Sequence, residues 1–253
     1  MQKRNKYDLA RHISEPVKRA VRRACGFGCV VCGTPFIQYH HSDVAYADAK
    51  IHDPAKITLL CGTCHDRVTR GTYSNEKIEE HVAHPYCLEN GPAYTDIDYG
   101  RDAPNIRFAG SEFENCMFPV RIHDYGLITL QKPVEQGSPV LLSALFTNSQ
   151  GNVSVVIDRN NVLLMPANWD VTTEGTRVRV WDAARKPSLT LNIVPRTLLE
   201  IERIESSFLG WSISGDTKEF RVTQPGAKGP NTFSGIRMGG GHIGFQFGKS
   251  NLR

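Results

Sequence analysis

The sequence contains no long hydrophobic run. None of its apolar stretches approaches the roughly 18 residues at which a transmembrane helix is expected. The N-terminal residues MQKRNKYDLARHISEP are charged and lack the apolar segment of a secretory signal. The sequence therefore predicts a cytoplasmic protein that makes no contact with a membrane.

The cysteines do not follow the pattern of a disulfide framework. Four of the seven cysteines lie in two Cys-x-x-Cys pairs, which is typical of a metal site in a reducing compartment. Cys25, Cys87 and Cys116 are left over, and we expect them to be reduced thiols.

A strong overall charge is also missing, because the formal net charge is only +4. The charge is unevenly spread, however: residues 1–28 hold eight basic side chains and two acidic ones. A cationic face of this density suits the phosphate backbone of a nucleic acid. The alternative is a basic helix face that meets only solvent. The candidate phosphate contacts on this segment are Lys18, Arg19, Arg22 and Arg23.

The two cysteine pairs predict a structural metal. Cys29 and Cys32 form the first pair, and Cys61 and Cys64 form the second. Two such pairs supply the four thiolates of the tetrahedral site that Zn²⁺ prefers. Cys25 lies one helical turn before Cys29 and is a competing ligand, but the spacing to Cys32 favours Cys29.

Three histidines accompany the pairs. His40 and His41 lie between them, and His65 follows the last cysteine directly. A purely structural zinc site does not need these imidazoles. They therefore suggest a second metal ion with a hydrolytic role.

Local patterns place these residues on short elements. Ser14 is a favourable N-cap for a helix with an apolar stripe at every third or fourth position, which Gly26 or Gly28 can end. We expect strands over 36–41 and 57–60, a helix over 64–70 and a further helix over 75–83.

Residues 15–73 resemble the HNH nucleases of the ββα-metal class, in their zinc-binding four-cysteine variant. The resemblance rests on CGFGCVVCG, YHH, HDPAKITLLCGTCH and DRVTRG, and covers about a quarter of the chain. It implies that His41 is the general base and that His40 and His65 hold the catalytic ion. Since His40 stands where the family often has an acidic ligand, softer ions such as Mn²⁺ or Ni²⁺ are favoured over Mg²⁺.

One position departs from the family pattern. Lys56 stands where the motif usually has an asparagine that braces the loop carrying the base. His52 or Asp53 in the same loop could take over that contact. Arg67 and Arg70, on the helix after His65, are further candidates for phosphate contacts, with a solvated helix face as the equal alternative.

The rest of the chain differs in pattern. Residues 87–105 hold two prolines and two glycines without apolar periodicity, which predicts a linker or surface crossing. Ten short β-type runs follow from about 106 onward, whereas 197–206 is ambiguous between helix and strand. The predicted fold is α+β: a zinc-stapled ββα-metal nuclease domain over 1–86, then an all-β sandwich or barrel over 106–253.

The expected function is metal-dependent hydrolysis of DNA phosphodiester bonds, in phage defence or as a restriction-type nuclease. The expected cofactors are structural Zn²⁺ and a catalytic Mg²⁺, Mn²⁺ or Ni²⁺. The β domain would recognise a target, bind a protein partner or form a homo-oligomer. Two alternatives remain: an inactive zinc-containing DNA-binding or scaffold protein, and a nuclease that cleaves RNA.

Overall fold

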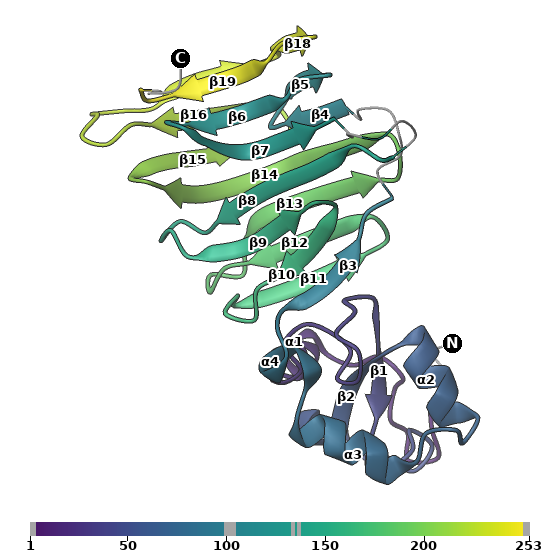
Figure 1. Cartoon of the computed structure of the whole chain (residues 1–253). Coiled ribbons are helices and arrows are strands. Elements are labelled where there is room, and N and C mark those ends of the chain that lie inside the picture. The colour runs from purple at the N-terminus through teal and green to yellow at the C-terminus, as the bar shows by residue number, and fades with distance from the viewer. Residues whose placement is uncertain (1–3, 99–104, 133–134, 136–137, 250–253) are drawn as a thin grey trace. The chain divides into compact units, whose positions relative to one another are not determined.

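The computed structural model describes residues 4–98, 105–132, 135 and 138–249 (Figure 1). The chain forms two compact units. The first comprises Met1–Thr95 with Leu164–Val171, and the second comprises Asp96–Leu163 with Thr172–Arg253. Within the described residues, no helix is both long and apolar enough to cross a membrane.

The first unit carries the helices of the chain and one small sheet. Its elements are α1 (Glu15–Ala24), β1 (Ile37–His41), the short 3-10 helix η1 (Pro54–Lys56), β2 (Ile57–Cys61), α2 (Gly62–Thr69), α3 (Asn75–Ala83) and α4 (Tyr86–Glu89). The helices begin at local signals: Ser74 Oγ accepts from the Lys77 N–H at the start of α3. At the start of α2, the acceptor is the Cys61 sulfur, which receives the Cys64 N–H at 3.3 Å.

The sheet of the first unit is an antiparallel hairpin of β1 and β2. Its register pairs Tyr39 with Leu59 and His41 with Ile57. All five residues of β2 are buried, so this strand forms the centre of the core. The hairpin therefore delivers His41 to the end of a rigid strand. The buried residues of this core are Ile13, Val21, Cys25, Cys29, Val30, Ile57, Leu59, Leu60, Cys61, Cys64 and Ile78.

The remaining strands form two large sheets. One sheet has the order β19-β6-β7-β8-β9-β10-β3, and the other has the order β11 to β17, with β4, β5 and β18 joined to it through β14. The bounds are β3 Ala93–Asp96, β4 Asn105–Phe108, β5 Ser111–Glu114, β6 Phe118–Ile122, β7 Tyr125–Gln131, β8 Leu141–Thr147, β9 Val153–Asp158, β10 Asn161–Leu164, β11 Asp170–Glu174, β12 Arg177–Trp181, β13 Pro187–Val194, β14 Leu198–Phe208, β15 Trp211–Gly215, β16 Glu219–Thr223, β17 Asn231–Ser234, β18 Arg237–Gly239 and β19 Ile243–Phe247.

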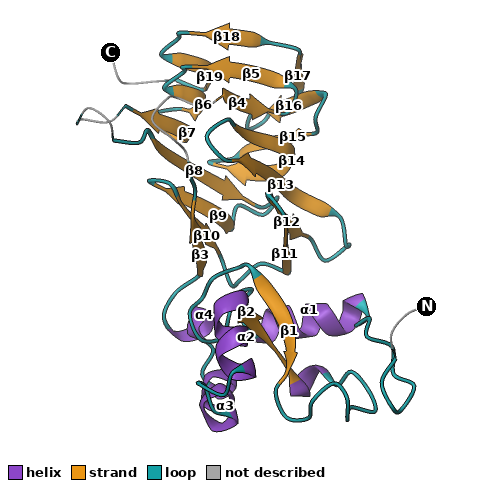
Figure 2. Ribbon diagram, turned by 90° about the vertical axis from the view of Figure 1, so that its right-hand side faces the viewer, coloured by secondary structure: helices purple, strands orange, loops and turns teal. Residues whose placement is uncertain are grey.

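The second unit is a sandwich in which these sheets face each other (Figure 2). Alternate residues of β8 and β14 are buried, as expected for strands with one face toward a core. Phe108, Phe113 and Phe220 are among the largest buried side chains. Thr147 in β8 and Ser206 in β14 share a buried hydrogen bond at 2.7 Å, which ties the two layers together.

The observed elements refine the expectations from the sequence. Residues 198–206 of the ambiguous stretch are strand, because they belong to β14, whereas Thr197 lies in the preceding turn. Within the predicted linker 87–105, residues 87–89 belong to α4 and residues 93–96 form β3, so this stretch contains a short helix and a strand. Residues 99–104 of that stretch lie outside the described residues. The chain combines a small helical unit with a mostly β unit, in keeping with the α+β class.

Candidate metal centre and histidine cleft

Four cysteine thiols converge in the first unit. Cys29 and Cys32 follow α1, Cys61 ends β2, and Cys64 lies in the first turn of α2. Their sulfur atoms all lie within 4.8 Å of one another, and Cys32 Sγ is 3.7 Å from Cys61 Sγ. A tetrahedral zinc site with Zn–S bonds of about 2.3 Å places its sulfurs about 3.8 Å apart. The four thiols therefore form a cluster that can hold a metal ion of the size of Zn²⁺.

The environment of the cluster favours a bound cation. Burial raises the pKa of Cys32 to about 11, and it also raises the pKa of Cys64. Burial acts to raise the pKa of Cys61 too, but hydrogen bonds from the Cys64 N–H and from the neighbouring thiols together outweigh burial, and the pKa is lowered. Four clustered thiols, three of them in buried residues, resist joint ionisation without a counter-charge, which a divalent ion supplies on coordination.

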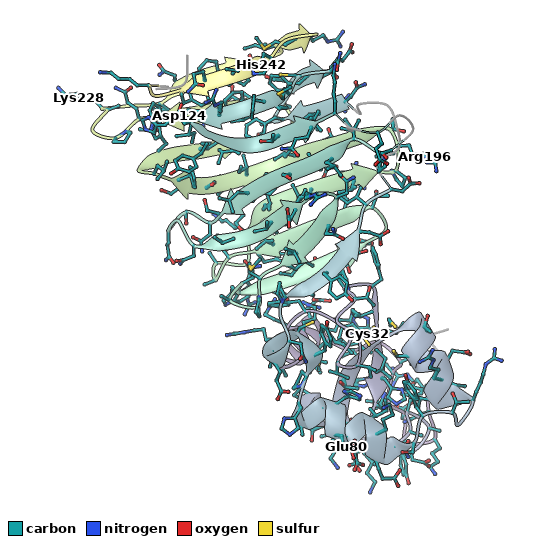
Figure 3. The ribbon with its side chains drawn as sticks, viewed as in Figure 1. Cys32, Glu80, Asp124, Arg196, Lys228 and His242 are labelled. Carbon is teal, nitrogen blue, oxygen red and sulfur yellow. The ribbon has the colours of Figure 1, made fainter. Side chains whose placement is uncertain are left out.

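The other two cysteines of the first unit lie outside this cluster. Cys25 Sγ contacts Thr58 Oγ1 at 3.6 Å, and Cys87 Sγ donates to the Gly33 carbonyl at 3.6 Å. The competition between Cys25 and Cys29 is thus resolved in favour of Cys29. Figure 3 shows further sulfur atoms beside the labelled Cys32.

Three histidines lie on β1, which pairs with β2, and on α2, which also carries Cys64. His40 and His41 end β1, and His65 follows Cys64 in α2. The rings of His40 and His65 meet edge-on, with centroids 5.1 Å apart. All three histidines border one cavity of about 580 Å³ within the first unit. The cavity is lined by Arg11, His12, Ile13, Lys18, Tyr39, His40, His41, Ser42, Asp43, Ala45, Tyr46, His65 and Asn75.

The histidines of the cleft favour their neutral forms. Burial, with the nearby His65 and His41, lowers the pKa of His40 from 6.5 to about 4. Burial and His52 lower the pKa of His41 as well. At neutral pH both rings therefore keep a lone pair, which is needed to bind a metal or to accept a proton.

Lys56, at the usual asparagine position of the motif, does not line the cleft. Its ammonium pairs with Asp43 at 2.6 Å, and both side chains are about half exposed. The side chain of His41 contacts His52 rather than Lys56, and His52 Nδ1 lies 3.3 Å from His41 Nε2. From the sequence, His52 and Asp53 are equal candidates to replace the missing asparagine. Asp53 accepts the Ala55 N–H and caps η1.

Two of the predicted phosphate contacts form ion pairs with Asp170. Arg22 is buried and donates from Nε and Nη2 to Asp170, at 2.8 and 2.6 Å. Arg19 pairs with the same carboxylate at 3.2 Å and lies 4.3 Å from the Trp169 ring centroid. The expectation that Arg22 faces a nucleic acid is therefore wrong, because its charge is neutralised inside the first unit.

The other predicted contacts stay closer to the surface. Lys18 lines the cleft and pairs with Glu15 at 3.2 Å, and Arg23 is exposed on α1. Arg67 donates to the Tyr73 hydroxyl at 2.6 Å. Arg70 pairs with Asp66 at 2.8 Å and is mostly exposed. Of these side chains, Lys18 alone lines the cleft.

The cleft also contains side chains that sequence reasoning missed. Arg11, His12, Tyr46 and Asn75 come from three separate stretches of the chain, and no motif connects them to the histidines. The uneven charge of residues 1–28 included Arg11 but gave no reason to select it.

Comparison with known proteins adds no identity. No protein-family model, curated protein or solved structure matches the chain. A functional assignment therefore rests on the residues of the cluster and the cleft and on their geometry.

Proposed function

We propose that the protein is a metal-dependent endonuclease of the HNH type that hydrolyses DNA. One observation carries the proposal: His40, His41 and His65 border a single cleft, on the β1–β2 hairpin and the helix α2 that together supply two cysteines of the four-cysteine cluster. The cluster would hold the hairpin and α2 in place through Zn²⁺, and the cleft would perform the chemistry.

His40 and His65 are placed so that both rings could bind one metal ion. An ion about 2.1 Å from one nitrogen of each ring would put the ring centroids roughly 5 Å apart. The centroids of His40 and His65 are 5.1 Å apart. Mg²⁺, Mn²⁺ and Ni²⁺ are the candidates, and imidazole ligands favour Mn²⁺ and Ni²⁺. When bound, such an ion supplies Lewis acidity to the scissile phosphate and the leaving oxygen.

The chain's own residues would do the rest of the work. His41 would accept a proton from the attacking water, since its lowered pKa keeps it neutral at cellular pH. Lys18 and Arg11 line the same cleft and would attract the phosphates that flank the scissile bond. The resemblance to HNH nucleases implies products with 5′-phosphate and 3′-hydroxyl ends.

Plasmid nicking by the full chain tests the proposal. Wild-type protein with Mn²⁺ should convert supercoiled plasmid to the nicked form, and His41→Ala should lose this activity. His84→Ala is a matched control, because His84 is 71% exposed and pairs with Glu89 away from the cleft. Equal nicking by wild type and His41→Ala would show that this cleft does not hold the base.

Lys56, in place of the usual asparagine, supports a second candidate function: an inactive zinc-containing protein that binds DNA or acts as a scaffold. Such a protein would bind without cleaving. The third candidate is a nuclease that cleaves RNA. If the protein is given plasmid and structured RNA in parallel, preferential cleavage of the RNA identifies this function.

The second unit would then direct the nuclease, in phage defence or restriction. Basic and acidic side chains alternate there in pairs, such as Arg177 with Glu202 and Arg107 with Glu112. Such internal neutralisation favours contact with a protein partner or a second copy over a DNA-reading surface. Light scattering of the full chain measures the oligomeric state directly.

A further inference from the structure

We propose that His52 is the positioning residue of this site, and that it fixes which nitrogen of His41 carries the proton. The proposal rests on the function proposed above, in which His41 is the base. It assigns a role to a residue outside the histidine motif, anchored by the N-terminal segment of the chain.

The hydrogen-bond chain starts at a group with only one possible role. His52 Nε2 lies 2.8 Å from the carbonyl oxygen of Ala10. A carbonyl oxygen can only accept a hydrogen bond, so Nε2 of His52 must carry the hydrogen. In the neutral ring, the Nδ1 of His52 is then a lone-pair acceptor.

The orientation of His52 in turn decides the hydrogen bond to His41. His52 Nδ1 faces His41 Nε2 at 3.3 Å. Because Nδ1 of His52 has no hydrogen to give, Nε2 of His41 must be the donor. The lone pair of His41 is thereby placed on its Nδ1, the ring atom that would take the proton from water. The reverse arrangement would require hydrogens on both nitrogens of His52, and thus a cation among several neutral rings.

The position of His52 is itself held from several directions. Its ring stacks on Tyr46, with an interplanar angle of 8°, and the Tyr46 hydroxyl donates to the Leu9 carbonyl at 2.8 Å. Asn5 Nδ2 lies 2.6 Å from the carbonyl oxygens of both Tyr46 and Ala49. Residues 5–10 therefore clamp the loop that carries His52, as a second layer of contacts around the base.

This arrangement explains how the site can dispense with the motif's asparagine. Lys56 occupies that position but turns to Asp43. The bracing contact to His41 is made from elsewhere in the same loop, by His52. Ligand-orienting contacts of this kind are typically worth about 10–100-fold in activity.

Three substitutions at one position separate the two hydrogen bonds. His52→Asn places an amide oxygen near the position of Nδ1, so it keeps an acceptor for His41 but loses the bond to Ala10. His52→Gln reaches toward Ala10 but offers no acceptor at the Nδ1 position. His52→Ala removes both contacts.

The direct measurement is the tautomer of His41 in the full-length zinc-loaded protein. It is read from imidazole ¹⁵N NMR shifts at roughly pH 8, where histidines are neutral, and assigned by comparison with His41→Ala. Wild type and His52→Asn should show hydrogen on Nε2 of His41, whereas His52→Ala and His52→Gln should show a mixture. In plasmid nicking, kcat should fall about 10–100-fold for His52→Ala and His52→Gln at unchanged KM. For His52→Asn it should fall only a few-fold.

The outcomes distinguish this proposal from the one on which it rests. An unchanged His41 tautomer in His52→Ala would overturn the positioning role, whatever the nuclease activity. The positioning role would also be overturned if all three variants lost the same factor in kcat and each loss matched a fall in thermal stability. That result would indicate a merely structural residue. A tautomer shift in a protein that cleaves no nucleic acid would support the positioning role and refute the nuclease proposal.

Discussion

Replacing Asp170 by alanine should destabilise the first unit by about 3 kcal/mol, at the lower end of the 3–5 kcal/mol typical of breaking a buried ion pair. The side chains of Arg22 and Asp170 are 6% and 3% exposed, and the two groups meet through both carboxylate oxygens. Alanine would leave the guanidinium buried without this anion. Tyr39 and Glu15 also accept from Arg22, at 2.7 and 3.3 Å, which is why the lower figure is expected.

The effect on thermal unfolding depends on the size of the unit. For a domain of 60–100 residues, each kcal/mol shifts the melting temperature by about 4–8 °C, so the first unit should melt about 12–24 °C lower. Urea is the suitable denaturant, because guanidinium would screen the ion pair. Hydrogen exchange of the α1 amides gives a local measurement, since α1 carries both Arg19 and Arg22.

A double substitution separates the ion pair from simple packing. Arg22→Met combined with Asp170→Leu should be far closer to wild type than either single change, because no buried charge is left alone. The reasoning would be refuted if Arg22→Met weakened DNA binding and its salt dependence but left stability and α1 exchange untouched. That result would make Arg22 a phosphate contact.

Two further predictions concern the metal and the pH. Removing zinc with a chelator, or introducing Cys64→Ser, should unfold the first unit and leave the second folded, because the four clustered cysteines belong to the first unit alone; retained exchange protection in α1 and α2 of the zinc-free protein would contradict this. Burial and the neighbouring His65 and His41 lower the pKa of His40 from 6.5 to about 4. As the pH falls from 6.5 to about 4, His40 therefore binds a proton in the unfolded chain but not in the native state. In the absence of a catalytic ion, the first unit should therefore lose stability between pH 6.5 and about 4, and the urea midpoint of His40→Gln should vary less with pH over that range.

The elements around the site can be predicted from the sequence because their signals are local. The helix expected over 75–83 is α3, capped by Ser74, and the two expected strands are β1 and β2. The paired cysteines likewise converge as their spacing indicates. The burial of Arg22 has no such signal, because Asp170 lies 148 residues further along the chain.

The ambiguity over 197–206 also has a physical cause. In β14, Leu199 and Ile201 are buried in alternation, but the next buried residue is Ile204. The pairing with β13 shifts at this point, because Leu191 faces Ile201 while Thr190 faces Arg203. The bulge inserts one extra residue and interrupts the period of two. The sequence therefore matches neither a regular strand nor a helix, although the segment is a single strand.

The return of residues 164–171 to the first unit has a consequence for how the protein is made. During synthesis α1 emerges early, but the carboxylate that neutralises Arg22 is added only after the strands from β4 to β10. A nascent chain that ends before residue 170 lacks this carboxylate, which leaves the more exposed Glu15 as the acidic partner of the buried Arg22. The N-terminal unit is therefore not portable: a fragment that stops at Thr95, or a graft into another protein, omits a part on which α1 depends.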